Sequence, residues 1–202
     1  MKKLLIALLM FGCLAGMAQP AHADWVWVNR HHHYNPYARP HFYLGLAPVA
    51  VGIVDETGPR SYLSSGGGFD LFLGVRANKW FALELGWQPT FHRPEYDQFG
   101  ERVDRIGLQA VTLDGKFYFV HGPIQPYVTA GVGAYLLGDS FDVFAEGPGF
   151  QVGGGVDFWI GPHFSIGLKL QYRGVDLIDV DPNNDDTFVS MITGAVDFTV
   201  RF

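Results

Sequence analysis

The chain has 202 residues, of which 48% are hydrophobic, 15% aromatic and 17% charged, and its formal net charge is −6. This composition excludes an intrinsically disordered chain, which needs low hydrophobicity and high net charge. Beyond the N-terminal region no run of about 18 consecutive apolar residues occurs, so the mature chain has no predicted membrane-spanning helix. The acidic balance also argues against nucleic acid as a partner.

The N-terminus has the pattern of a secretory signal peptide. Two lysines precede an apolar run over residues 4–14, and small residues at Ala21 and Ala23 suit a signal peptidase. We therefore predict a signal peptide over residues 1–23, removed in the mature protein. The one cysteine, Cys13, lies inside this segment. Lipid attachment at Cys13 is the alternative, although the residues before it match a lipoprotein signal poorly.

Residues 24–41 are predicted to form a periplasmic N-terminal segment rich in histidine, proline and aromatic residues. Its histidines are His31, His32, His33 and His41. Neutral imidazoles bind zinc, copper and nickel, so these four residues are candidate metal ligands. Three consecutive histidines without a nearby cysteine or carboxylate give no fixed geometry, and the favoured interpretation is a solvated tail without cofactor or metal.

From residue 42 onward, apolar side chains recur at every second position, which is typical of strands with two different faces. Eight such segments are predicted: 42–54, 68–76, 80–91, 103–120, 126–138, 149–160, 164–173 and 188–202. Pro48 weakens the first of them. In the fourth, the apolar positions change phase around Gln109 to Val111, which predicts a β-bulge there.

The connections between these segments alternate in length. Residues 55–67, 92–102, 139–148 and 174–187 form long connections, and tight turns separate the other pairs. Short turns on one side, longer loops on the other and an even strand number are typical of transmembrane β-barrels. The predicted fold class is therefore all-β, an eight-stranded antiparallel up-and-down transmembrane β-barrel over residues 42–202.

The polar faces of the strands carry equal numbers of acidic and basic residues. These candidate lumen ion-pair residues are Asp70, Glu84, Asp114, Asp157 and Asp197 with Arg76, Lys116, Lys169, Arg173 and Arg201. A barrel of eight strands has an interior that side chains can fill, and buried charges need partners. We therefore predict a lumen plugged by paired charges.

Aromatic residues near the strand ends match the girdles that such barrels place at the membrane interfaces. The predicted girdle comprises Trp80, Phe81, Phe119, Tyr127, Trp159, Phe164, Tyr172, Phe198 and Phe202.

The pattern resembles a known family, the small eight-stranded outer-membrane barrels of Gram-negative bacteria, of the OmpA transmembrane-domain and OmpX type. The resemblance covers residues 42–202 and rests on residues 126–135 and on the last strand, which ends with Phe198, Val200 and Phe202. It implies a location in the outer membrane and assigns the terminal aromatic residue to recognition by the barrel-assembly machinery. The expected partners are outer-membrane lipid and lipopolysaccharide, together with the barrel-assembly machinery during insertion, and we expect the barrel to be a monomer.

Two other patterns suggest sites and are incomplete. Asp179, Asp181 and Asn183 have calcium-loop spacing, but Asn184 replaces the turn glycine and Ser190 the bidentate glutamate. His163-Phe-Ser165 resembles the His-x-Ser element of lipid A deacylases. However, the asparagine that follows this element in those enzymes is absent here, and His163 is predicted to lie in a short, periplasmic turn. No catalytic site is predicted.

Two classes of function remain open from the sequence. The first is a non-enzymatic barrel with a structural, envelope-integrity or surface-interaction role and a plugged lumen. The alternative is a narrow channel for small or hydrophobic solutes. An enzyme is disfavoured, because no motif places a nucleophile beside a base.

Overall fold

The structure is a computed structural model that describes residues 37, 39–57, 64–92, 106–138, 143–179 and 187–202. Its strands are β1 (His41–Thr57), β2 (Gly66–Arg76), β3 (Phe81–His92), β4 (Ile106–Tyr118), β5 (Ile124–Gly138), β6 (Val143–Trp159), β7 (Phe164–Asp179) and β8 (Thr187–Arg201). No helix in these ranges has the length and apolar character needed to cross a membrane. The predicted signal peptide and residues 24–36 lie outside the described residues.

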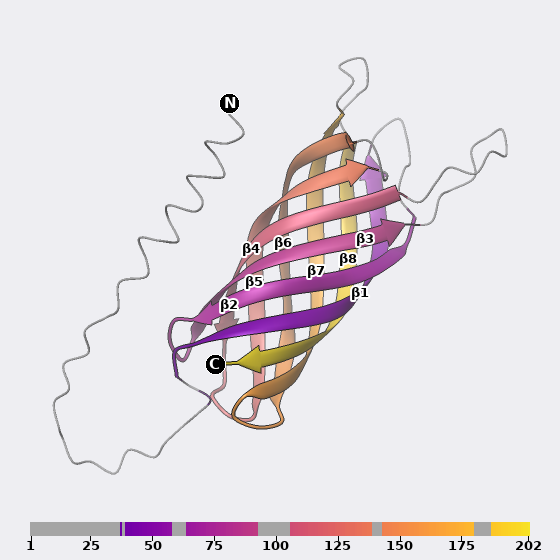
Figure 1. The fold of residues 1–202 in the computed structure, drawn as a ribbon. Helices are drawn as coiled ribbons and strands as arrows, with labels where there is room; N and C mark the ends of the chain where they lie inside the picture. The colour runs from indigo at the N-terminus through magenta and orange to yellow at the C-terminus, as the bar shows by residue number, and fades with distance from the viewer. Residues whose placement is uncertain (1–36, 38, 58–63, 93–105, 139–142, 180–186) are drawn as a thin grey trace, which may run out of the picture. The chain divides into compact units, whose positions relative to one another are not determined.

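The eight strands form a closed antiparallel barrel in which each strand pairs with the next along the chain (Figure 1). β1 and β8 close it, and the ladder continues to the terminal residue, where the Phe202 amide donates to the Phe42 carbonyl at 2.9 Å. Full closure leaves no unpaired sheet edge. The predicted fold class is confirmed.

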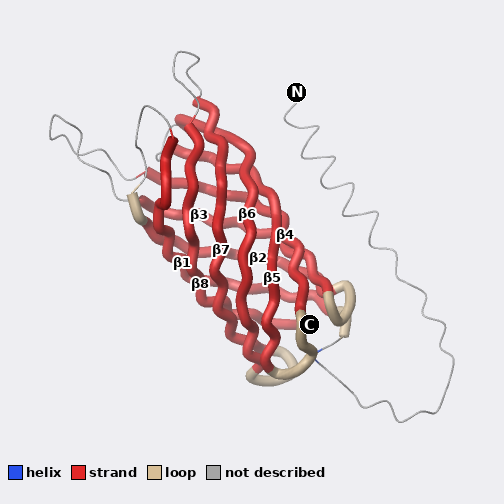
Figure 2. The backbone as a smooth tube through the Cα atoms, turned by 180° about the vertical axis from the view of Figure 1, so that it is seen from behind, coloured by secondary structure: helices blue, strands red, loops and turns tan. Residues whose placement is uncertain are grey.

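The two ends of the barrel differ in their connections. At the turn end, residues 77–80, 119–123 and 160–163 join consecutive strands, and Figure 2 shows these turns together with the C-terminus. At the opposite end, here called the loop end, β6 and β7 are longer than predicted. The connection between β5 and β6 shrinks to residues 139–142, so the expectation of a long loop over 139–148 was wrong.

The predicted bulge around Gln109 to Val111 is also wrong. β4 pairs with β3 and β5 in continuous register through this region. The apparent change of phase arises because Leu108 and Ala110 face the interior, where the sequence interpretation expected only polar side chains. Register irregularities occur instead at Ile53/Asp55 in β1 and at Leu137/Gly138 in β5.

Pro48 is tolerated in β1 because one of its two ladders is partly open beside it. β1 runs through Pro48, which pairs with Phe69 of β2. On the β8 side the paired residues jump from Leu46 to Val49. Since proline has no amide hydrogen to donate, the missing pairs lie where its nitrogen would have bonded.

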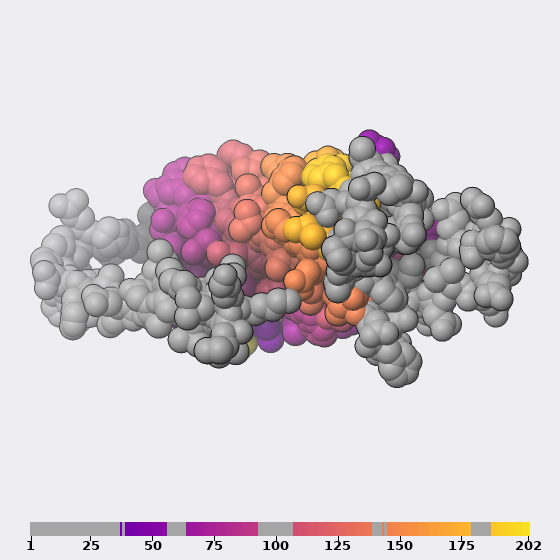
Figure 3. All heavy atoms as spheres, turned by 90° about the horizontal axis from the view of Figure 1, so that it is seen from above, coloured from indigo at the N-terminus to yellow at the C-terminus, as the bar shows by residue number. Residues whose placement is uncertain are grey.

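The outer wall is apolar and the inner wall is mixed. In the space-filling view the strands follow one another in chain order across the visible face, from magenta to yellow (Figure 3). Exposed large apolar side chains come from every strand, among them Leu44, Leu73, Val111, Val132 and Leu170. A wall of this kind needs an apolar surrounding, because large contiguous apolar patches are rare on soluble proteins.

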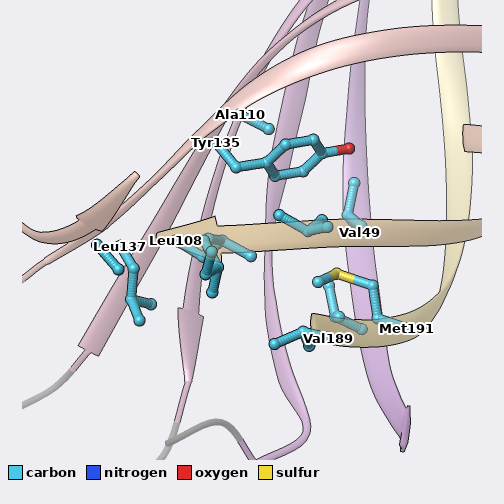
Figure 4. Close-up of a cluster of buried hydrophobic side chains, with 11 residues drawn as sticks. Val49, Leu108, Ala110, Tyr135, Leu137, Val189 and Met191 are labelled. Carbon is cyan, nitrogen blue, oxygen red and sulfur yellow. The ribbon is translucent and has the colours of Figure 1, made fainter. Parts of the chain in front are cut away.

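Two clusters of buried apolar residues occupy the interior. The turn-end cluster consists of Tyr43, Ala47, Phe72, Ala82, Tyr118 and Tyr127. The loop-end cluster consists of Val49, Val51, Leu108, Ala110, Tyr135, Leu137, Ala145, Val175, Leu177, Val189 and Met191. Figure 4 shows side chains of the loop-end cluster pointing toward one another from different strands. The lumen is therefore a packed core and not a uniformly polar channel.

Candidate functional site

The candidate site is the charged part of the lumen. All ten charged residues predicted to face the interior are buried: Asp70, Arg76, Glu84, Asp114, Lys116, Asp157, Lys169, Arg173, Asp197 and Arg201. They alternate with outward apolar residues, so the two-residue period of each strand directs them inward. Their ion-pair and hydrogen-bond partners come from several strands.

Two lysines form the tightest pairs, in the middle of the barrel. Lys116 Nζ lies 2.7 Å from Glu84 Oε1. Lys169 Nζ lies 2.9 Å from Asp70 Oδ2 and 3.7 Å from Asp197 Oδ1. Both ammonium groups lie near the ring of Phe72, with Nζ-to-centroid distances of 5.5 Å for Lys116 and 5.2 Å for Lys169. This arrangement, the central block, fills the lumen with paired charges around one aromatic ring.

At the turn end, two arginines stack on aromatic rings. The Arg201 guanidinium lies 3.7 Å from the centroid of the Trp159 ring and 3.6 Å from Asp157 Oδ2. The Arg76 guanidinium lies 4.0 Å from the Tyr118 ring centroid. The Tyr118 hydroxyl donates to Asp157 at 3.2 Å, so the two stacks share one carboxylate.

The segment before β1 adds to this end of the lumen. Tyr37 packs edge-on against Trp159, with ring centroids 5.1 Å apart. Its carbonyl accepts a hydrogen bond from Gln125 Nε2 at 3.2 Å, and Gln125 Oε1 accepts one from Arg76 at 2.6 Å. The turn end is therefore closed by aromatic and cationic side chains.

Toward the loop end, hydrogen bonds replace ion pairs. Gln151 donates to Asp114 Oδ2 at 2.6 Å, and the Tyr135 hydroxyl donates to Gln151 Oε1 at 3.0 Å. Arg173 donates to Gln171 Oε1 at 3.0 Å. In the described part of the chain, neither Asp114 nor Arg173 has an ion-pair partner within 4.0 Å.

Glycines on the inner face make room for the rings. A methyl group at Gly45 would overlap the Phe72 ring, and one at Gly74 would overlap the Tyr43 ring. In the same way Gly155 leaves space for Tyr127. The abundance of glycine in the polar phase of the strands was visible in the sequence, but the ring that each glycine accommodates was not.

Two aromatic residues assigned to the interfacial girdle belong to the lumen. Trp159 and Tyr127 are 8% and 2% exposed, and both face inward. Their position near strand ends misled the sequence interpretation, because position along a strand does not fix the face. Trp80 and Phe119, which were also predicted for the girdle, are exposed at the turn end, and the ring of Phe117 contacts both.

His121 lies in the turn beside this outer aromatic group. Its ring is edge-on to Trp80, with centroids 4.1 Å apart. Desolvation by its neighbours, followed by the positive charges of Arg76 and Lys79, holds the pKa of His121 below its usual value. The turn therefore carries a histidine that favours the neutral form.

The candidate metal ligands divide between described and undescribed regions. His31, His32 and His33 lie outside the described residues. His41 is the first residue of β1, where its ring packs edge-on against Trp159 at 5.8 Å and Nδ1 lies 2.7 Å from the Arg39 carbonyl oxygen. The described ranges contain no group of three histidine, cysteine or carboxylate side chains placed to hold a metal.

The acidic segment and the last strand complete the predicted sites. Asp181 and Asn183 lie outside the described residues, and Asp179 is the last residue of β7. Phe198, Val200 and Phe202 alternate along the outer face at the end of the chain, where each is exposed. This placement leaves them accessible, and their role as an assembly signal stays a prediction.

The fold and the reversed polarity of its two faces define a class: barrels that cross a membrane with apolar side chains outside and paired charges inside. The chain belongs to the outer membrane protein beta-barrel domain family, whose model matches residues 6–200. This confirms the resemblance derived from the sequence and the assignment to an outer-membrane β-barrel. A search among curated proteins gives no match.

Solved structures agree at the level of the fold. Neisserial surface protein A (NspA) superposes with a TM-score of 0.60 at 16% identity, covering 80% of this chain and 97% of that one. OprG from Pseudomonas aeruginosa superposes with a TM-score of 0.59 at 14% identity, covering 82% and 97%. At such identities the likeness concerns the fold alone.

Proposed function

We propose that this protein is a non-enzymatic outer-membrane barrel whose lumen is closed to solutes and whose wall or external loops serve envelope integrity or surface interactions. The central block is the observation that supports a closed lumen. Lys116, Glu84, Lys169 and Asp70 meet around Phe72, and each is at most 8% exposed. Paired side chains that are this deeply buried occupy the middle of an interior that, in a barrel of eight strands, side chains can fill, and this supports a closed lumen.

The proposal includes the expected partners and route. Lipopolysaccharide surrounds the external part of the barrel, the barrel-assembly machinery inserts it, and the barrel works as a monomer. A signal peptide over residues 1–23 directs export and is then removed. Deletion of the protein, followed by measurement of envelope permeability to a dye, tests the integrity role, and unchanged permeability would favour surface interaction.

Planar-bilayer recording of the full mature chain tests the closed lumen. The wild-type protein is expected to give no stable unit openings. Phe72→Ala removes the ring that both lysines contact and should produce unit openings, because it leaves a cavity in the middle of the lumen. Phe69→Ala is the matched control, since Phe69 lies on the same strand and is exposed on the outer face. Stable openings in the wild-type protein would overturn the proposal.

The alternative function, a narrow path for small hydrophobic solutes, is favoured by one observation. The loop-end cluster lines its half of the lumen with apolar side chains, which would accept an apolar solute more readily than a charged one. Uptake of an apolar fluorescent solute into vesicles separates the alternatives. A rate above that of protein-free vesicles, abolished by Met191→Glu, would support the channel, and an unchanged rate would exclude it.

A further inference from the structure

Three polar groups at the turn end of the lumen have hydrogen atoms to donate and no acceptor. They are Trp159 Nε1, Ser165 Oγ and Arg201 Nη1, each buried and without a hydrogen-bond partner within the described protein. The indole N–H and the guanidinium can only donate, and the serine hydroxyl can do so. Because a buried donor without an acceptor is costly, three such groups in one region indicate that an acceptor belongs there.

The three donors come from neighbouring positions on β6, β7 and β8. Trp159 and Ser165 pair directly across the β6–β7 ladder, and both face inward. Side chains opposite each other in this way have Cβ atoms about 5 Å apart. The guanidinium carbon of Arg201 lies 3.7 Å from the centroid of the Trp159 ring. The Arg201 amide also donates to the carbonyl of His163, two residues before Ser165, at 2.8 Å. The three side chains therefore form one group, here called the donor group.

The same end of the lumen has two guanidinium groups and one carboxylate to share between them. Arg201 lies 3.6 Å from Asp157, a distance longer than a hydrogen bond. In the described part of the chain, Arg76 has no carboxylate within 4.0 Å and donates to neutral oxygen atoms. Asp197 pairs instead with Lys169 in the central block. Since buried charges need partners, one positive charge at the turn end calls for an anion.

We propose that the donor group binds one small monovalent anion such as chloride. An anion accepts hydrogen bonds from all three donors and also offsets the guanidinium charge, whereas water would satisfy the donors alone. The ion must be small, because side chains fill the interior of a barrel of eight strands. It enters from the turn end, where in this class the short turns are periplasmic. The site completes the charge balance of the lumen, whether or not the lumen conducts solutes.

Crystals of the full mature protein grown in sodium bromide test the site directly. Bromide replaces chloride in most anion sites and is recognised by its anomalous scattering. We expect one anomalous peak within hydrogen-bond distance of Trp159 Nε1, Ser165 Oγ and Arg201 Nη1. A water molecule at this place, without an anomalous peak, would overturn the proposal.

Urea-induced unfolding in lipid vesicles measures the same binding in solution. Chloride is exchanged for the much larger gluconate at constant sodium, and the urea midpoint of the wild-type protein should rise with chloride concentration. Trp159→Phe keeps a ring beside Arg201 and removes the N–H group. It should raise the chloride concentration at half-saturation by about tenfold. Trp87→Phe is the matched control, because Trp87 is exposed on the outer wall.

A second pair of variants leaves every ring and charge in place. Ser165→Ala removes the hydroxyl of the donor group and should also weaken the dependence on chloride. Thr129→Val removes a buried hydroxyl on β5, outside the donor group, and should leave that dependence unchanged. The proposal is wrong if the wild-type midpoint is equal in chloride and gluconate, or if Trp159→Phe and Ser165→Ala keep the wild-type dependence. Heat-dependent gel mobility confirms that each variant is folded.

Discussion

The two halves of the lumen bury opposite kinds of side chain within the same barrel. From the turn end to the middle, charges pair with one another and stack on rings, as Lys116 does with Glu84 and Arg201 with Trp159. Toward the loop end, beyond Asp114 and Arg173, a large apolar cluster fills much of the interior, with Val175, Leu177 and Met191 among its members. A few buried polar residues, such as Thr90 and His92, remain beside it. Strand geometry is the same in both halves. It therefore determines which side chains point inward, but it does not determine whether those side chains are polar or apolar.

The largest loss of stability is expected when one buried charge is removed from the polar half of the lumen. Lys116→Met keeps much of the side-chain volume but leaves Glu84 buried without its partner. Loss of one member of a buried pair costs about 3–5 kcal/mol. Urea-induced unfolding in lipid vesicles, followed by tryptophan fluorescence, should show a loss of this size.

The double variant Lys116→Met with Glu84→Leu sharpens this test. Removing both charges removes the desolvation cost together with the attraction, so most of the stability should return. If the double variant is as unstable as Lys116→Met, the pair contributes through packing and not through charge. Its bilayer conductance would then show whether charge is needed to close the lumen.

In the apolar half, stability is tested by creating a cavity instead of by leaving a charge unpaired. Leu177→Ala removes a side chain that is 3% exposed in the loop-end cluster. The expected loss in the free energy of unfolding is about 2–5 kcal/mol, measured by the same urea titration. Ile178→Ala is the control on the same strand, because Ile178 is exposed on the outer face and should cost much less.

The sequence predicted the polar half better than the apolar half, and the reason is physical. A charge such as Asp70 or Lys169 among alternating apolar residues can only face inward when the outside is hydrocarbon. When the interior is also apolar, as at Leu108 and Val175, both faces look alike and the phase of the strand is lost. The predicted bulge in β4 and the early end predicted for β7 at residue 173 both follow from this loss.

The sequence did not predict which charged residues would form ion pairs with one another in the lumen. Lys169 and Asp70 lie 99 residues apart on β7 and β2, on strands that do not pair. Which charges meet depends on the stagger of the strands round the closed barrel. The contact of Tyr37 with Trp159 was equally hidden, since it requires that Trp159 face the lumen.

An exchange of equal-sized side chains compares the two halves directly and should give the smallest effects. Val175 is fully buried in the apolar half, so Val175→Thr places a hydroxyl among apolar groups and should cost about 1–3 kcal/mol. Thr129 is 2% exposed in the polar half, and its Oγ1 has no hydrogen-bond partner within the described protein. Thr129→Val removes that buried hydroxyl and should therefore leave stability unchanged or raise it. The urea midpoints of the two variants should move apart, and a loss at Thr129 as large as at Val175 would contradict this expectation, because it would mean that the buried Thr129 hydroxyl stabilises the fold.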